Sequence, residues 1–485
     1  MRRSAANVLG EVSAYAGWRG PATNNGGGTL ASLQDRLDEI AREAAHDLGI
    51  AGAQVAAWDG RTLTEAAVGM ANVETGVAVT PDTLFTIGST TKVFTAALVM
   101  QLVDEGRVDL DRPVVEQLPE LRLADPEATR TVTPRHLMSM SSGIDNGSYD
   151  DHGRGSDAVA RYVAALADEP MGFLPGRGYG YSNASTCVSG RLVEHVTGLD
   201  WDAALRQRLL EPAGLSQSWS LTEDIIHRRF AVGHTRATAS TPAEVVHRWS
   251  LPRSLSPAGA TLSCSAGDLV RFARIFLDGG VAPSGARVLS EGAVREMLTP
   301  QVLTPPILMA DFWGLGPYGK TWDGKVVIGH TGTTPVGSSS LMWVPELGVA
   351  LATIVNCREM GYPFAAAVQA RLFPEAFGIR VPGKPKPVEG VPVDAARLLG
   401  TYEMHGTRIV VEASPGGIAA RVASTIPDAD AVGEASPLLA LTPTSFLPTD
   451  PRIDGNRGWA LVFLGPDDAP ATHLMNGCFA LRRVG

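Results

Sequence analysis

Lysine and cysteine are both scarce in this chain. Lysine occupies only five of the 485 positions, namely 92, 320, 325, 384 and 386, so a motif that requires lysine is improbable by chance. The four cysteines are Cys187, Cys264, Cys357 and Cys478, and no two of them form a CxxC pair. This spacing supports neither a zinc ribbon nor a disulfide-dense scaffold, so free buried thiols are expected rather than one long-range disulfide. No metal and no other cofactor is predicted.

The sequence also lacks a long apolar run and an excess of positive charge. No stretch approaches the ~18 apolar residues needed to span a bilayer. Met1-Arg2-Arg3 is followed by Glu11 and polar residues instead of the apolar core of a signal peptide, so a cytoplasmic protein is expected. Acidic residues (51) outnumber basic ones (41), giving a net charge of −10, so neither a nucleic acid nor a membrane is an expected partner. The oligomeric state stays open.

The composition is that of a globular protein with more than one domain. Hydrophobic residues make up 44% and charged residues 19% of the chain. Glycine (53) and proline (33) sum to roughly 18%, below the ~25–30% typical of low-complexity chains. At 485 residues, two or three domains are expected. Residues 1–28 have no periodicity and end in Asn24-Asn25-Gly26-Gly27-Gly28, which predicts a disordered tail.

Residues 29–377 combine strands and helices in a pattern that predicts one α+β domain. Apolar residues at steps of three and four predict an amphipathic helix from Leu30 to about Leu48. Asp59-Gly60 joins two strand-like runs and predicts a hairpin. A helix that is apolar on nearly all sides is predicted from near Ser89 to Gly106, and helical patterns with turns continue to about residue 310. Three strands within residues 325–356 and a helix over about 363–377 follow, so an antiparallel sheet is expected between terminal helices, with a helical region inserted.

The remainder of the chain reads as a linker and a small β-domain. Residues 378–394 contain four prolines and are predicted to be a linker. Residues 395–485 show short strand patterns separated by Pro, Gly and Asp turns, which predict an all-β barrel or sandwich.

The stretch Gly314–Thr321 matches both the phosphate-loop pattern GxxxxGK[ST] and the dinucleotide pattern GxGxxG. Both motifs need a strand before the glycines and a helix after them, because the helix N-terminus holds the phosphate. Two prolines interrupt the preceding stretch, and a turn and a strand follow. A glycine-rich loop without nucleotide is therefore expected.

The strongest chemical signal is Ser89-Thr90-Thr91-Lys92 at the start of the buried helix. About 0.3 chance matches to SxxK are expected in this composition, so the placement matters more than the pattern. Three-residue spacing on a helix sets the amine beside the hydroxyl, and burial lowers the pKa of a lysine toward the neutral base. The alternative is an ordinary N-cap at Ser89 and a surface lysine at Lys92.

Two further motifs carry suitable side chains. Tyr181-Ser182-Asn183 offers a phenol that can pass a proton to a leaving group and an amide that can hold a carbonyl or the lysine. An ordinary Asx turn is the alternative for this motif. His330-Thr331-Gly332 ends a strand, and Gly332 would allow a substrate to approach the backbone closely; the alternative is a core or edge histidine.

Together, in this order, the three motifs resemble those of the serine β-lactamase/penicillin-binding-protein superfamily. The resemblance is to the branch with class C β-lactamases, D-alanyl-D-alanine carboxypeptidases, D-aminopeptidases and esterases, and it covers about residues 30–377. LFTIGSTTKVFTAALVMQLVDEGRVDLD and GHTGTTPVGSSSLMWVPELG are among the stretches that look like this family. The β-domain resembles the lipocalin-like appendages of some D-aminopeptidases and penicillin-binding-protein-type thioesterases.

The resemblance implies a role for each matching residue. Ser89 would be the nucleophile, Lys92 the general base, Tyr181 the proton relay and Asn183 the group that orients Lys92 and the substrate amide. The backbone N–H groups of Ser89 and Thr333 would form an oxyanion hole, and Thr331 and Gly332 would bind substrate. His330 stands where lactamases commonly carry lysine, a pattern that resembles carboxypeptidases and D-aminopeptidases.

Three functions remain open from the sequence. The first is a metal-independent serine hydrolase that cleaves an ester or amide, with D-configured peptides as one substrate class. The second is an acyltransferase or peptide cyclase that uses the same acyl-enzyme but excludes water from it. The third is a non-catalytic binding module. The loop after Gly143, the Trp313–Trp322 region and the β-domain are the expected determinants of specificity.

Overall fold

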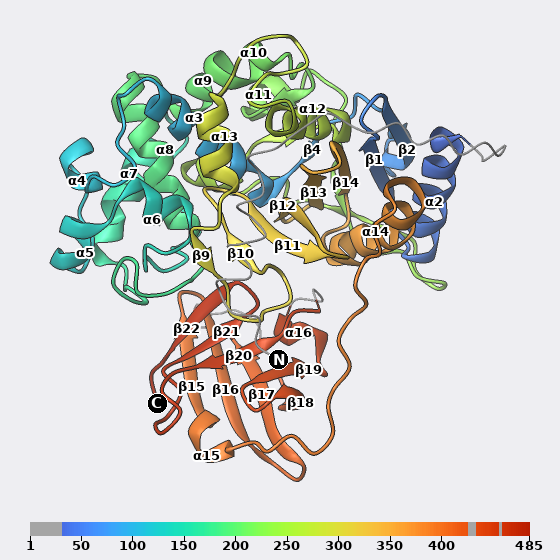
Figure 1. Cartoon of the computed structure of the whole chain (residues 1–485). Coiled ribbons are helices and arrows are strands. Elements are labelled where there is room, and N and C mark those ends of the chain that lie inside the picture. The colour runs from blue at the N-terminus through green and yellow to red at the C-terminus, as the bar shows by residue number, and fades with distance from the viewer. Residues whose placement is uncertain (1–31, 425–432, 455–457) are drawn as a thin grey trace.

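The computed structural model describes residues 32–424, 433–454 and 458–485. The tail expected over residues 1–28 lies outside these ranges, as do the first residues of the predicted N-terminal helix. Figure 1 shows a mixed α/β body, with a separate β-barrel below it at the end of an extended segment. The predicted fold class, an α+β body with a small all-β C-terminal unit, is confirmed.

A nine-stranded antiparallel sheet forms the centre of the larger body, in the order β3-β2-β1-β14-β13-β12-β11-β10-β9. β1 pairs with β14, so early and late segments of the chain meet in the middle of the sheet. The strands are β1 (Gly52–Trp58), β2 (Leu63–Asn72), β3 (Val77–Ala78), β9 (Val302–Leu303), β10 (Phe312–Trp313), β11 (Tyr318–Trp322), β12 (Lys325–Thr333), β13 (Ser338–Val344) and β14 (Val349–Val355).

Both faces of this sheet are covered. Every residue of β14 is buried. Ala350, Ala352 and Ile354 join one hydrophobic core, and the alternate residues Leu351 and Val355 join another. Side chains on a strand point alternately to opposite faces, so β14 lies between two cores.

Helices α2 (Leu33–Asp47) and α14 (Gly361–Phe377) cover one face, and α12 (Ala266–Leu277) covers the other, on the side of α3 (Thr91–Asp104). α2 begins later than Leu30 because Ser32 is its N-cap and forms a capping box with Asp35. α3 is buried from Thr91 to Leu102, as its apolar pattern predicts. Gly106 follows it with a φ of 68°, a conformation that suits glycine after a helix.

The inserted region is mainly helical. Its α-helices are α4 (Val114–Gln117), α5 (Pro126–Thr131), α6 (Pro134–Met138), α7 (Ala158–Ala165), α8 (Asn183–Thr197), α9 (Trp201–Leu205), α10 (Glu211–Ala213), α11 (Thr222–Ile225) and α13 (Glu291–Leu298). Short 3₁₀-helices are η2 (Gly88–Thr90), η3 (Leu166–Asp168), η5 (Arg253–Ala258) and η6 (Arg358–Met360), and η4 (Arg206–Leu210) is a short π-helix. Two small sheets also occur, formed by β4 (Phe85–Thr86), β8 (Ser263–Cys264) and β5 (Ser218–Trp219), and by β6 (Gly233–His234) and β7 (Val245–Val246).

The C-terminal unit is a closed eight-stranded antiparallel barrel. Its strands are β15 (Gly400–Met404), β16 (Thr407–Ser414), β17 (Gly417–Ala423), β18 (Ser436–Thr442), β19 (Ser445–Pro448), β20 (Leu461–Leu464), β21 (His473–Asn476) and β22 (Phe479–Arg483), accompanied by α15 (Ala395–Leu398) and α16 (Pro451–Asp454). Within the described residues, closure gives each of these strands a hydrogen-bonded neighbour on both sides. The sequence left barrel and sandwich open, and the structure selects the barrel.

The barrel and the larger body share a hydrophobic cluster. Tyr179, Tyr181 and Trp313 come from the larger body, and Trp459 and Met475 come from the barrel. Among the helices of the described ranges, none combines the length and the apolar character needed to cross a membrane.

Candidate active site

Ser89 lies in the short turn η2, directly before α3, and is partly exposed between the buried residues Gly88 and Thr90. The prediction placed it on the first turn of the helix itself; instead the α-helix begins at Thr91 and Thr90 occupies the N-cap position. The N-cap reading of Ser89 is therefore wrong. The turn leaves the Ser89 hydroxyl accessible beside a helix N-terminus, where the helix dipole favours negative charge.

The end of β12 packs directly against this turn. A Cβ on Gly332 would lie 1.8 Å from the carbonyl oxygen of Ile87 and 2.8 Å from the backbone nitrogen of Ser89. A Cβ on Gly88 would lie 2.6 Å from the backbone nitrogen of Thr333. Glycine is therefore required at both positions, and the backbone N–H groups of Ser89 and Thr333, expected to form an oxyanion hole, belong to the same small region.

The Lys92 amine is surrounded by three oxygen atoms. Lys92 Nζ lies 3.1 Å from Ser89 Oγ, 2.6 Å from Asn183 Oδ1 and 2.7 Å from the carbonyl oxygen of Ala258. Lys92 is 1% exposed, and burial lowers its pKa to about 7. The alternative of a surface lysine is thereby wrong, and near neutral pH a large share of the amine is uncharged.

Asn183 is the first residue of α8, and the Ser182 side chain caps this helix by accepting a hydrogen bond from Ser185 N–H. Asn183 Nδ2 donates to the hydroxyl of Tyr149 (3.0 Å). Tyr149 is 45% exposed and belongs to the loop after Gly143 that the sequence nominated for specificity. Asn183 thus connects the buried amine of Lys92 to a side chain on the surface of the site.

Tyr181 lies over the Lys92 amine, with Nζ 4.8 Å from the ring centroid. Burial raises the pKa of Tyr181 well above its usual value, and a hydrogen bond to the Ser89 side chain opposes this shift only in part. Tyr181 is therefore a neutral phenol at physiological pH and can donate a proton. In the resting state Lys92 is the better base.

His330 is buried beside Tyr181, Trp313 and Tyr318, with ring centroids 5.7–6.2 Å from its own. Its Nδ1 lies 2.6 Å from the carbonyl oxygen of Thr331, which fixes the proton on Nδ1. Burial, with the nearby Lys92, lowers the pKa of His330 to about 3. His330 is consequently a neutral hydrogen-bond acceptor at Nε2 and supplies no positive charge.

Thr331 is held by tyrosines from two elements. Its hydroxyl lies 3.3 Å from the hydroxyl of Tyr362 on α14, and it also hydrogen-bonds the side chain of Tyr318 on β11. The sequence analysis nominated the regions that contain Tyr149 and Tyr318 without naming either tyrosine, and it missed Tyr362. No motif marks Tyr362 or Tyr318, because they reach the site from α14 and β11 only after the chain has folded.

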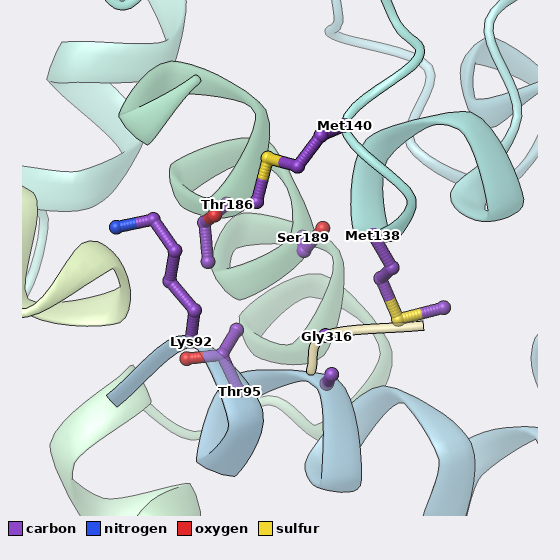
Figure 2. Close-up of a pocket in the computed structure, with 8 residues that line it drawn as sticks. Lys92, Thr95, Met138, Met140, Thr186, Ser189 and Gly316 are labelled. Atoms are coloured by element: carbon purple, nitrogen blue, oxygen red, sulfur yellow. The ribbon is translucent and has the colours of Figure 1, made fainter. Parts of the chain in front are cut away.

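A small cavity lies behind Lys92. Figure 2 shows Lys92 and Thr95 on α3 facing Thr186 and Ser189 on α8, with Met138 on the side away from the amine. Its volume is about 10 Å³, close to the minimum for one water molecule. The substrate must therefore approach Ser89 from elsewhere.

Within the Gly314–Thr321 stretch, residues 314–317 form a tight connection between the paired strands β10 and β11, and the rest of the stretch, Tyr318–Thr321, belongs to β11. Gly314 N–H donates to the Pro317 carbonyl oxygen (2.9 Å) inside it. A strand rather than a helix follows the glycines, so the geometry of a phosphate loop is not formed by these residues.

Comparisons with known proteins identify the family and the structural relatives of this chain. The Beta-lactamase family model matches residues 37–373. "Penicillin-binding protein 4" of Amycolatopsis lactamdurans is 41% identical over 381 residues, covering 78% of this chain and 98% of that protein. The crystal structure of SurE, also solved with D-Leu, superposes with a TM-score of 0.76 at 30% identity and covers 93% of this chain and 99% of that one.

A third relative is the D-amino acid amidase of Ochrobactrum anthropi, whose structure with D-phenylalanine has a TM-score of 0.57 at 25% identity, covering 67% of this chain and 92% of that one. The chain belongs to the Beta-lactamase family. It is a serine hydrolase or acyltransferase of the penicillin-binding-protein-like type.

Proposed function

We propose that the protein cleaves an ester or amide bond through a covalent acyl-enzyme on Ser89. The observation that carries this proposal is the setting of the Lys92 amine, 3.1 Å from Ser89 Oγ and with a pKa of about 7. A serine hydroxyl is a weak nucleophile unless an adjacent base removes its proton.

The hydrogen-bond inventory around Lys92 supports its role as that base. A neutral amine has two N–H donors and one lone pair. Asn183 Oδ1 and the Ala258 carbonyl oxygen can only accept hydrogen bonds, so they take both donors. The lone pair is then left for the Ser89 hydroxyl, which donates to it. This assignment of hydrogens follows from the network of heavy atoms.

The proposed cycle moves one proton at each step. Lys92 takes the Ser89 proton as Oγ bonds to the substrate carbonyl carbon, and the N–H groups of Ser89 and Thr333 stabilise the oxyanion. Tyr181 gives its proton to the leaving alcohol or amine and recovers one from Lys92. Water then attacks the acyl-enzyme with the same groups acting in reverse. Asn183 orients Lys92 and the substrate. Thr331 and Gly332 belong to the end of β12, along which the substrate is proposed to bind.

The acyl group is proposed to carry a D-configured residue. Two structural relatives are a D-amino acid amidase and SurE, which has been solved with D-Leu. The neutral His330 further favours a substrate without an anion at that end of β12, because this imidazole offers a lone pair and no charge. This makes a carboxypeptidase that reads a free terminal carboxylate through His330 the weaker alternative.

Transfer of the acyl group to an amine is the second candidate. The observation that favours it is the aromatic surround of the site: Tyr181 contacts both Trp313 and Phe479 edge to face, and His330 contacts Tyr318. An aromatic surround of this kind disfavours water at the acyl-enzyme and so favours an amine that binds in its place.

Intact mass spectrometry tests the acyl-enzyme. A fluorophosphonate or a β-lactam is expected to add once to the wild type and not to Ser89→Ala. Labelling that persists in Ser89→Ala would refute the assignment.

Product analysis then separates hydrolysis from transfer. A D-aminoacyl ester is supplied with and without a peptide amine. An aminolysis product that exceeds the free acid at millimolar amine would favour transfer.

A further inference from the structure

The backbone of Tyr181 is bonded to the barrel. Tyr181 N–H donates to the carbonyl oxygen of Cys478 (2.9 Å), which lies in the turn between β21 and β22. On the preceding residue, Gly180 N–H donates to Met140 O (2.9 Å) within the larger body. Two successive backbone N–H groups thus have partners in different parts of the protein, Met140 in the larger body and Cys478 in the barrel.

The Tyr181 ring is held in the same manner. Its centroid lies 5.7 Å from Trp313 of the larger body and 5.5 Å from Phe479 of the barrel, at interplanar angles of 68° and 84°. Edge-to-face contacts at these distances are favourable and directional. Loss of the Phe479 ring would therefore leave the phenol with room to rotate away from Ser89.

The turn that makes these contacts is itself tightly built. Gly477 has a φ of 55°, and a Cβ there would lie 1.9 Å from the ring of Trp459. Trp459 contacts the ring of Tyr362 (5.5 Å), whose hydroxyl lies 3.3 Å from Thr331 Oγ1. The barrel therefore contacts Tyr181 directly through Phe479. It also contacts Tyr362, the tyrosine that lies beside Thr331 of the His330-Thr331-Gly332 motif.

Polar contacts fix the docking further from the serine. His405 N–H, in the turn after β15, donates to Asp145 Oδ2 (3.1 Å), and His405 Nδ1 lies 3.2 Å from Glu169 Oε2. Asp145 precedes Asn146, whose side chain accepts a hydrogen bond from Asn183 N–H (3.2 Å). The barrel is thus attached both to Tyr181 and to the loop whose Asn146 side chain holds the backbone of Asn183.

We propose that the barrel turn Asn476–Phe479 is a positioning element for Tyr181, so that efficient proton delivery to the leaving group requires the docked barrel. This inference rests on the proposed acyl-enzyme mechanism. Phe479 acts through Tyr181 and not on the substrate. A barrel that merely covered the larger body would affect stability alone.

Leaving-group dependence tests this role. A p-nitrophenyl ester expels a stable phenolate and needs little help from an acid, whereas an alkyl ester or anilide needs a proton from Tyr181. In Phe479→Ala, kcat for the alkyl ester is expected to fall at least about tenfold, with less than about a threefold change for the p-nitrophenyl ester. Phe479→Leu keeps apolar volume and is expected to lie between these values. Leu439→Ala, an exposed barrel residue, is the matched control.

A double-mutant cycle completes the experiment. Added to Tyr181→Phe, Phe479→Ala is expected to have almost no further effect on the alkyl ester, because both changes remove the same function. Rates are divided by the fraction of active sites titrated with a fluorophosphonate, so loss of folded enzyme is not counted. Equal losses on both esters, additive effects or unchanged selectivity would each overturn the positioning role. Absence of Ser89 labelling in the wild type would instead overturn the underlying acyl-enzyme mechanism.

Discussion

Asn183 Oδ1 is closer to the Lys92 amine than Ser89 Oγ is, at 2.6 Å against 3.1 Å. The amide therefore controls how the amine is oriented and how readily it is protonated. A neutral acceptor satisfies an N–H of the amine without adding charge, which leaves the pKa of Lys92 at about 7 under the influence of burial. A carboxylate in the same place would stabilise the ammonium form.

Asn183→Asp is therefore predicted to raise the pKa of Lys92. Acylation needs the neutral amine, so the rate at pH 7 falls and recovers as pH rises. The wild-type acid limb should have its midpoint near pH 7, and that of the variant should lie at least one unit higher. Stopped-flow acylation by an activated ester from pH 5 to 10 measures both. An unchanged midpoint in a variant that still acylates would show that Lys92 is not the base.

Lys92→Arg is predicted to abolish acylation although it keeps the positive charge, because the pKa of arginine exceeds 12 and the side chain cannot act as a base. Tyr181→Phe should slow acylation by an alkyl ester or anilide by roughly 10²–10⁴, because these leaving groups need its proton. The double variant should be little slower than Lys92→Arg alone, since effects within one catalytic unit are not additive. Single-turnover rates, with circular dichroism to verify folding, make the comparison. A folded Lys92→Arg enzyme that acylates near the wild-type rate would refute the mechanism.

His330→Gln is predicted to leave the midpoint of the acid limb near pH 7. The pKa of His330 is about 3, so the imidazole is uncharged across the working range and its loss removes no charge near Lys92. The rate should fall by less than about tenfold, because only an acceptor and ring packing are altered. A midpoint that rises by a unit in His330→Gln would mean that the imidazole is charged and opposes protonation of Lys92.

Gly332→Ala is predicted to damage both stability and acylation, because the new Cβ would lie 1.8 Å from the Ile87 carbonyl oxygen. Such overpacking costs about 1–3 kcal/mol of unfolding free energy. Gly416→Ala is the control, since a Cβ there meets no atom within 4 Å. Thermal melts and active-site titration of the two variants give the comparison. Equal melting temperatures would contradict the close packing of β12 on η2.

The sequence predicted the parts of the site that rest on local spacing. Ser89 and Lys92 stand three residues apart on one turn, and Tyr181 with Asn183 brackets a helix N-terminus, so short motifs describe them well. The sequence could not predict that the Ala258 carbonyl contacts Lys92. Every residue carries a carbonyl group, and only the folded structure shows which one lies beside the amine. Phe479 and Tyr362 could not be assigned to the site for a related reason: aromatic residues far apart in the sequence come into contact only in the folded chain.

The helices and strands also differ in how well the sequence predicted them. The nearly continuous apolar run of β14 and the apolar pattern of α3 are strong signals, since both elements are buried on all sides. The strand patterns RIVVEA, GIAARVA, PLLALTP, WALVFLG and CFALRRV match β16, β17, β18, β20 and β22, whereas β15, β19 and β21 were not predicted. These three strands are four or five residues long and partly exposed, so their alternation is weak. The start of α3 was misplaced by two residues because a 3₁₀ turn before it contains the serine.

The bond between Tyr181 and Cys478 has a consequence for biosynthesis. Ser89 and Lys92 are made early and belong to a helix that can be buried as soon as its neighbours have emerged from the ribosome. The acceptor for Tyr181 belongs to the last pair of barrel strands and is translated long afterwards. A nascent chain therefore carries its nucleophile and base for most of its synthesis without the group that holds its proton relay, and on the proposed mechanism its reactivity toward amides matures only when the barrel closes.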